Sequence, residues 1–221
     1  MNRRYLVVGV AGVLIAAGLL GTGALVVSQS TVSPEAIASS VSRTPELMER
    51  AWRLPVAATF NRQLTWQSNR SRCGPAAVAN VYRSLGDAAS TESKVLAGTG
   101  RCWTGVCIFG LTLDELADVA RVNTTRKVTV LRDLSEEQFR EHLRRSSDRG
   151  RRYIVNFSRR PLFGAGIGHY SPIGGYLEAE DLVFVLDVNQ DYRPWLVERT
   201  RLFEAVNTFD GDKKRGLLLI E

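Results

Sequence analysis

The hydrophobic pattern separates an apolar N-terminal run from a longer region in which short helical and strand periods follow one another. Residues 5–27 carry no charged side chain, and these 23 residues are enough to span a bilayer as a tilted helix. Arg3 and Arg4 precede the run and the next basic residue is Arg43, so the positive-inside rule leaves the remaining chain outside the cytoplasm. We therefore expect residues 1–27 to be an uncleaved signal anchor, a single-pass transmembrane helix with the rest of the chain on the extracytoplasmic (periplasmic) side of the cell membrane. A cleaved signal followed by secretion is the alternative.

The sequence after residue 27 predicts a linker followed by one folded domain. Residues 28–45 are rich in Ser and Thr, which is typical of a linker, and residues 46–221 form the domain. In the domain helices come first and strands cluster late, which predicts an α+β fold rather than alternating α/β. The apolar spacing predicts helices at about 45–54, 73–85, 112–122, 135–147 and 202–206, and strands at about 127–131, 153–157, 170–176, 182–187 and 217–220.

A candidate nucleophile stands where the second of these helices begins. Cys73 precedes Gly74 and Pro75, and Pro is tolerated in the first turn of a helix. The unpaired N–H groups and the positive end of the helix dipole favour a thiolate at this position. Gln67 lies six positions upstream in an extended segment, from which its amide could donate to an oxyanion. On this stretch alone a small buried Cys is an equal alternative.

The two histidines differ in their surroundings. His142 lies on a charged helix face and is expected to be solvated, whereas His169 follows a Gly-rich loop and opens a strand. Asp187 ends the next strand, so a hairpin would bring it to His169 and let the carboxylate hold the imidazole in one tautomer. Cys73, His169 and Asp187 then act as nucleophile, base and orienting group. The alternative is a structural His beside a strand-end Asp.

The charge pattern and the other two cysteines limit which ligands, metals and binding partners we expect. The formal net charge is +6, but the basic residues are scattered among acids without an aromatic-interleaved stripe, which argues against nucleic acid and favours small anions. Cys102 and Cys107 could form a disulfide outside the cytoplasm or remain free thiols. No nearby His completes a zinc site, so we expect no metal site and no intrinsic cofactor.

These residues also carry a family resemblance, which covers about residues 46–221. The segment Gly-His-Tyr-Ser-Pro-Ile-Gly-Gly-Tyr at 168–176, together with Gln67, Cys73-Gly74 and Val-Leu-Asp-Val at 185–188, resembles the phytochelatin synthases, a papain-like clan that acts on glutathione. The resemblance implies a papain-like fold, with the catalytic Cys at a helix N-terminus and a C-terminal antiparallel sheet that carries His and Asp. It assigns the nucleophile to Cys73, the acid/base to His169, the orienting carboxylate to Asp187, an oxyanion-hole donor to Gln67, and substrate binding to Arg159, Gly168 and Ser171.

Two departures from the family pattern shape the expected reaction. The family places an Arg shortly after the Asp187 position, and the segment 188–194 has no Arg at that place. We associate that Arg with the binding of an acceptor glutathione. No Cys follows Cys107, whereas eukaryotic members carry a Cys-rich C-terminal region. We therefore expect cleavage of the Cys–Gly bond of glutathione with mainly hydrolysis to γ-Glu-Cys and glycine, and slower transfer to a second glutathione. Cadmium or zinc could enter as a metal–glutathione thiolate substrate or as an activator.

Two other functions remain open on the sequence. Leader-peptide-cleaving cysteine peptidases of the bacteriocin-processing type share the Gln…Cys-Gly spacing seen at Gln67 and Cys73. A catalytically inactive, membrane-anchored binding module is the third possibility. The block at 168–176 and the complete set of Gln, Cys, His and Asp favour the glutathione enzyme over both.

Overall fold

The computed structural model describes residues 31–102, 107 and 110–221. The predicted transmembrane segment, residues 1–27, lies outside this part of the chain. Within the described ranges, none of the helices combines the length and the apolar character that crossing a membrane requires.

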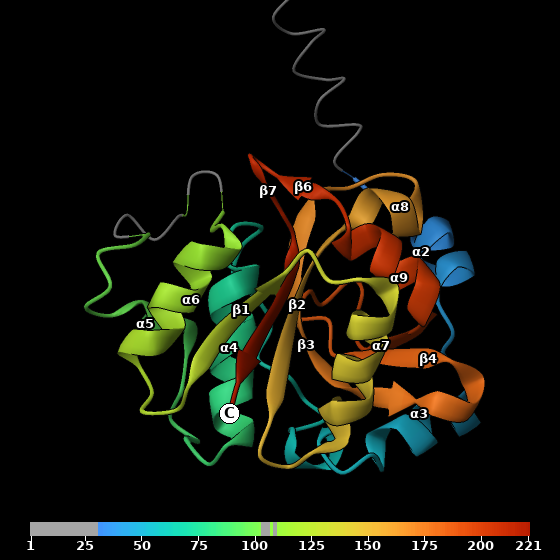
Figure 1. The fold of residues 1–221 in the computed structure, drawn as a ribbon, viewed down its shortest axis with the longest axis horizontal. Helices are drawn as coiled ribbons and strands as arrows, with labels where there is room; N and C mark the ends of the chain where they lie inside the picture. Colours follow the sequence, from blue (N-terminus) through green and yellow to red (C-terminus); the bar gives the residue numbers. More distant parts are fainter. Residues whose placement is uncertain (1–30, 103–106, 108–109) are drawn as a thin grey trace, which may run out of the picture.

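A six-stranded antiparallel sheet forms the centre of the molecule (Figure 1). Its strand order is β1-β8-β2-β3-β4-β5, so the last strand of the chain is inserted between β1 and β2. The strands are β1 (Val128–Arg132), β2 (Arg152–Ser158), β3 (Gly168–Leu177), β4 (Leu182–Val185), β5 (Trp195–Glu198) and β8 (Gly216–Ile220), with β6 (Phe209–Asp210) and β7 (Lys213–Lys214) as a separate hairpin. The predicted antiparallel sheet in the C-terminal half is confirmed.

Helices cover both faces of this sheet, as the apolar residues of β8 show. Leu218 and Ile220 belong to the core that contains α4 (Cys73–Ser84), α5 (Glu92–Leu96) and α6 (Leu113–Val122). Leu217 and Leu219 belong to the core that contains α7 (Glu136–Arg144), α8 (Arg159–Phe163) and α9 (Arg199–Val206). Successive side chains of a strand point to opposite faces, so a continuous apolar strand is expected where both faces are covered. Figure 1 shows the two groups of helices on opposite sides of the sheet.

Two of the helices begin at capping boxes that the sequence predicts. Thr112 and Glu115 form the predicted capping box of α6, and Ser135 and Gln138 form that of α7. The α-helices are α2 (Pro34–Ser40), α3 (Pro45–Trp52), α4 (Cys73–Ser84), α5 (Glu92–Leu96), α6 (Leu113–Val122), α7 (Glu136–Arg144), α8 (Arg159–Phe163) and α9 (Arg199–Val206).

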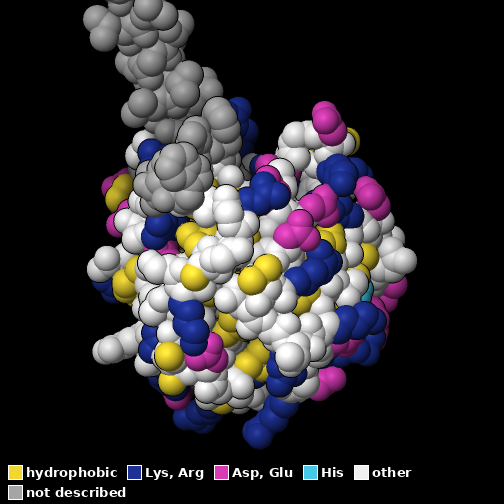
Figure 2. All heavy atoms as spheres, turned by 90° about the vertical axis from the view of Figure 1, so that its left-hand side faces the viewer, with side chains coloured by type: hydrophobic (Ala, Val, Ile, Leu, Met, Phe, Trp, Pro, Cys, Tyr) yellow, Lys and Arg dark blue, Asp and Glu magenta, His cyan; other side chains and the backbone are white. Residues whose placement is uncertain are grey.

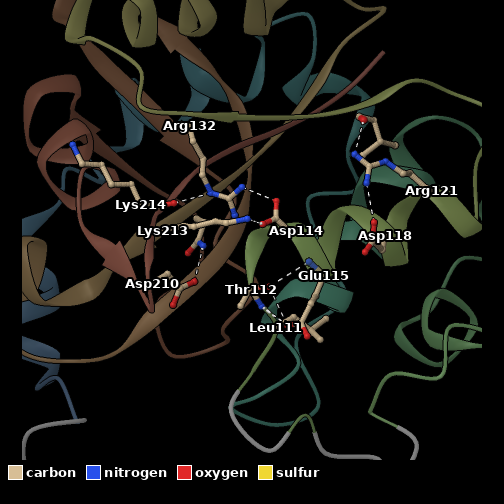
Figure 3. A network of polar contacts seen from close by, with 12 residues as sticks. Leu111, Thr112, Asp114, Glu115, Asp118, Arg121, Arg132, Asp210, Lys213 and Lys214 are labelled. Atoms are coloured by element: carbon tan, nitrogen blue, oxygen red, sulfur yellow. Dashed lines mark hydrogen bonds and ion pairs between the residues drawn. The ribbon is translucent and has the colours of Figure 1, made fainter.

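A polar network ties α6 to the sheet and to the β6–β7 hairpin (Figure 3). Asp114 accepts hydrogen bonds from Arg132 Nη1 on β1 at 2.6 Å and from Lys213 Nζ on β7 at 2.8 Å. Arg132 Nε also donates to the Lys214 carbonyl oxygen at 2.8 Å. One carboxylate on α6 therefore holds this helix both to β1, the next element of the chain, and to β7 near the C-terminus.

The predicted linker is partly folded. Pro34–Ser40 forms α2, which is capped by the Ser33 hydroxyl and packs against α8. Ser42 pairs with Leu196 at the edge of β5. The Ser- and Thr-rich composition suggested a linker because α2 has few apolar residues, and only Ile37 of this helix is buried. The structured chain therefore reaches further toward the N-terminus than residue 46.

Cys102 and Cys107 form a disulfide between α5 and α6. Of the two outcomes left open by the sequence, the structure therefore contains the bridge.

On the face shown in Figure 2, Lys and Arg side chains are interspersed with acidic and apolar ones, in agreement with the scattered charge of the sequence.

Candidate active site

Cys73 is the first residue of α4 and is buried against the sheet. The preceding residue, Arg72, makes no side-chain cap, and the first N–H groups of a helix have no intrahelical partner. Gly74 explains how the helix start can lie so close to α6, because a Cβ at this position would stand 2.9 Å from Leu116 Cδ1. The sulfur is therefore presented by a tightly packed helix N-terminus.

The structure brings His169 and Asp187 together. His169 lies at the start of β3, where it pairs with Phe157 of β2. Beyond the end of β4, the Leu186 N–H donates to the Pro172 carbonyl oxygen, so the chain still runs beside β3 when it reaches Asp187. His169 Nε2 then lies 2.9 Å from Asp187 Oδ1. Because Nε2 faces the carboxylate, Nδ1 is the ring nitrogen that remains for Cys73.

The Asp187 carboxylate is fully buried and bonded on all sides. Arg159 Nη2 donates to both oxygens at 3.1 and 3.0 Å, Trp195 Nε1 donates to Oδ2 at 3.0 Å, and the Asn189 N–H donates to Oδ1 at 2.9 Å. Burial raises the pKa of Asp187, but the charges of Arg159 and His169 and these hydrogen bonds hold that pKa well below its usual range. Asp187 is therefore ionised and fixed in orientation.

The charges around Cys73 and His169 favour a thiolate–imidazolium pair. Burial raises the pKa of the Cys73 thiol, but His169, the Tyr170 backbone and Arg159 lower it by more, so the pKa lies below its ordinary value. Burial and Arg159 lower the pKa of His169, but Asp187 and Cys73 raise it by more, so that pKa lies above its ordinary value. A low thiol pKa beside a high imidazole pKa is the pattern of a nucleophilic cysteine.

Gln67 lies at the same site, in the segment that leads into α4. Its backbone N–H donates to the Val188 carbonyl oxygen at 2.9 Å, which joins this segment to the chain just after Asp187. Its side-chain Nε2 donates to the Asn69 carbonyl oxygen at 3.0 Å, and an amide nitrogen has a second hydrogen to donate. Oε1 is buried without a hydrogen-bond partner among the described residues.

A cleft of about 680 Å³ opens onto His169. Gln67, Arg159 and Gly168 line it, as the sequence predicted for site residues. Arg159 Nη1 is buried there and has no hydrogen-bond partner among the described residues, while its guanidinium carbon lies 3.4 Å from the centre of the Tyr192 ring. Other lining residues are Thr31, Val32, Pro34, Ile37, Arg43, Arg70, Ile167, Asn189 and Asp191.

Two predicted placements, those of Ser171 and His142, need correction, and Arg159 has a further contact. Ser171 is fully buried on β3 and does not line the cleft, so the structure does not support direct contact with a substrate. Arg159 is engaged with Asp187 through Nη2, which leaves only its other nitrogens to a substrate. His142 is half-buried rather than solvated, and its Nδ1 lies 3.2 Å from the Tyr153 hydroxyl.

Among residues 31–102, 107 and 110–221, no group of three or more His, Cys, Asp or Glu side chains could hold a metal ion.

Comparison with known proteins identifies the family. The family model of phytochelatin synthase matches residues 27–217. The chain belongs to the phytochelatin synthase family. The glutathione gamma-glutamylcysteinyltransferase of Schizosaccharomyces pombe is 30% identical over 117 residues, which are 51% of this chain and 28% of that protein. Glutathione gamma-glutamylcysteinyltransferase 3 of Lotus japonicus is 36% identical over 119 residues, which are 51% of this chain and 25% of that protein. The matches thus span about a quarter of the length of these relatives.

A solved structure supports the papain-like fold of this phytochelatin synthase family member. A C39-like peptidase from Bacillus anthracis superposes with a TM-score of 0.53 at 12% identity, covering 73% of this chain and 95% of that one. At this identity the likeness concerns the fold alone. The papain-like fold expected from the sequence is confirmed.

Proposed function

We propose that this protein cleaves the Cys–Gly bond of glutathione through a γ-Glu-Cys acyl-enzyme on Cys73, and that water is the main acceptor of the acyl group. One observation carries the proposal: His169, bonded at 2.9 Å to the ionised Asp187, lies in the cleft and lowers the pKa of the Cys73 thiol. A buried cysteine without such partners would have a raised pKa and would be inert.

The reaction follows from these groups. The Cys73 thiolate attacks the carbonyl carbon of the Cys–Gly amide, and the Gln67 amide with the Cys73 backbone N–H stabilises the oxyanion. The imidazolium of His169 gives its proton to the departing glycine nitrogen, and the C–N bond breaks. His169, now neutral, takes a proton from water, which attacks the thioester and releases γ-Glu-Cys and the Cys73 thiolate.

The cleft suits a small, doubly carboxylated peptide. Its volume of about 680 Å³ lies within the range of sites for small ligands. Three arginines line it, Arg43, Arg70 and Arg159, whereas Asp191 is the acidic residue in the lining. The two carboxylates of glutathione fit a cleft with this charge excess, and Arg159 Nη1, buried without a partner among the described residues, is positioned to donate to one of them.

Hydrolysis is favoured because transfer needs a positioned acceptor. A dilute amine competes with water only if the protein holds it in an attack geometry. The segment 188–194 contributes Asn189, Asp191 and Tyr192 to the cleft and no basic side chain. A second glutathione therefore lacks the cationic partner there, and phytochelatin formation is expected to be slow. Cadmium or zinc would act as part of a metal–glutathione thiolate, as substrate or activator.

A product time course tests this function. The full chain is incubated with millimolar glutathione, with and without cadmium, and glycine, γ-Glu-Cys and (γ-Glu-Cys)₂-Gly are followed by mass spectrometry. We expect glycine and γ-Glu-Cys to accumulate together, with little of the longer peptide. Faster accumulation of (γ-Glu-Cys)₂-Gly would make the protein a synthase. A parallel incubation with a Gly-Gly leader peptide covers the peptidase alternative, and cleavage of neither substrate would indicate a binding module.

A further inference from the structure

The turn between Gln67 and Cys73 is held by a side chain that belongs to neither the triad nor the cleft. Glu92, the first residue of α5, is almost completely buried. Its Oε1 accepts a hydrogen bond from the Ser68 N–H at 2.9 Å, and its Oε2 accepts one from the Ser68 hydroxyl at 2.6 Å. Arg72 Nη1 lies 3.5 Å from the same Oε2. One carboxylate therefore contacts the residue after Gln67 and the residue before Cys73.

The interior of the turn is ordered by Asn69. Its side-chain Oδ1 accepts from the Ser71 N–H at 3.0 Å and from the Ser71 hydroxyl at 2.7 Å, while its carbonyl oxygen accepts from Gln67 Nε2 at 3.0 Å. The Cys107 N–H donates to the Ser71 hydroxyl at 3.1 Å, which adds a contact from the disulfide-bonded segment. The orientation of the Gln67 amide thus depends on where this turn lies.

The chemistry of Glu92 matches a positioning role better than a general contribution to packing. Its side-chain hydrogen bonds go to Ser68 and its ion pair goes to Arg72, and both residues belong to the turn 68–72. Burying a carboxylate costs free energy, which is offset only by well-formed, charge-assisted hydrogen bonds. A neutral side chain of similar shape would fill the same space but could not accept from Ser68 twice and from Arg72.

We infer that Glu92 is a positioning residue for the oxyanion hole: it holds the turn 68–72 so that the Gln67 amide and the Cys73 backbone N–H converge on the oxygen of the reacting carbonyl. This inference rests on the proposed acyl transfer to Cys73. A displacement of about 1 Å at such a donor is enough to lose a large part of its catalytic effect.

The variant Glu92→Gln tests the inference. It keeps the size of the side chain and removes the charge and one acceptor. We expect kcat to fall by about 10-fold to 10²-fold, a part of the loss seen when an oxyanion donor is removed outright, while KM changes by less than about twofold. The rate at which iodoacetamide alkylates Cys73 should stay within about twofold of wild type, because His169 and not the turn sets the thiolate. Lys94→Gln, on the same helix but exposed and paired with Asp87, is the matched control and should leave kcat unchanged.

A double-mutant cycle with Gln67→Ala separates positioning from simple stability. Because Glu92 acts in part through Gln67, Glu92→Gln should cost clearly less kcat once Gln67 is already alanine than it costs in the wild-type protein, since interacting residues are not additive. Additive losses, or losses in kcat and in alkylation rate that run in parallel, would overturn the inference. If Glu92→Gln fails to fold, Ser68→Ala removes the shortest of these bonds from the other side, and the same non-additivity is expected of it.

An acylation assay without glutathione keeps the two proposals distinguishable. Acetylation of Cys73 by p-nitrophenyl acetate also passes through a tetrahedral oxyanion, and its burst rate is measured on the same variants. A slower burst in Glu92→Gln from an enzyme that does not cleave glutathione would reject the proposed substrate and retain the positioning role. Normal kcat and a normal burst in Glu92→Gln, from an enzyme that does cleave glutathione, would reject the positioning role alone.

Discussion

Replacing Cys73 with serine is expected to lower the turnover of glutathione by a factor of about 10³ or more. The reason is the protonation state of the nucleophile. His169 and Arg159 hold the pKa of the Cys73 thiol below its ordinary value in spite of its burial, which makes the thiolate more accessible than in an ordinary buried cysteine. A serine hydroxyl has no accessible anion there, and the same partners cannot supply one.

The variant Cys73→Ser should still fold, since oxygen is smaller than sulfur and the hydroxyl can bond to His169. The measurement is steady-state turnover beside thermal unfolding and far-UV circular dichroism. A melting temperature close to that of wild type with turnover lost supports Cys73 as the nucleophile. Turnover above a few per cent of wild type would refute the assignment.

Replacing Asp187 with asparagine is expected to lower kcat by about 10²-fold to 10⁴-fold, the scale seen when the orienting carboxylate of a triad is neutralised. Two effects combine. An asparagine NH₂ must face at least one of the donors His169, Arg159 or Trp195, so the imidazole loses its fixed tautomer. The Arg159 charge also becomes a buried cation without its partner, which should lower stability by about 3–5 kcal/mol.

The pH profile separates these effects from simple unfolding. Asp187 raises the pKa of His169, so its neutralisation lowers that pKa and moves the alkaline limb of kcat/KM to lower pH. A less protonated imidazole stabilises the thiolate less, so the acid limb moves to higher pH. We therefore expect a narrower bell-shaped pH profile of kcat/KM for Asp187→Asn, measured well below the melting temperature of the variant. An unshifted bell of reduced height would mean that Asp187 does not tune His169.

The elements that carry the triad could be predicted because their signals are local. The apolar spacing after Cys73 and the capping box at Thr112 each determine a helix within one or two turns. The continuous apolar run 182–186 that leads up to Asp187 is typical of a strand covered on both faces, and antiparallel pairing with the strand of His169 then brings the two side chains together. The family resemblance added the papain-like fold, and it is also the source of the proposal that glutathione is the substrate.

The parts that could not be predicted depend on contacts between distant segments. Trp195 and Arg159 bond to Asp187 only because β5 and α8 lie next to the end of β4, and neither element has a clear period in the sequence. The role of Glu92 likewise follows from contacts across 24 positions of the chain. Ser171 stands in the most specific motif and on the same face of β3 as His169, yet it lies further along the strand, where it is fully buried and does not line the cleft.

The most direct test of the central claim is to trap the acyl-enzyme. The full chain is mixed with glutathione, quenched in acid within the first turnovers and examined by intact-protein and peptide mass spectrometry. The account predicts a mass increase of one γ-Glu-Cys acyl group on the peptide that contains Cys73, resistant to a phosphine reductant and removed by hydroxylamine, as a thioester is. Turnover without an adduct on Cys73, or an adduct of whole glutathione that the phosphine removes, would contradict it.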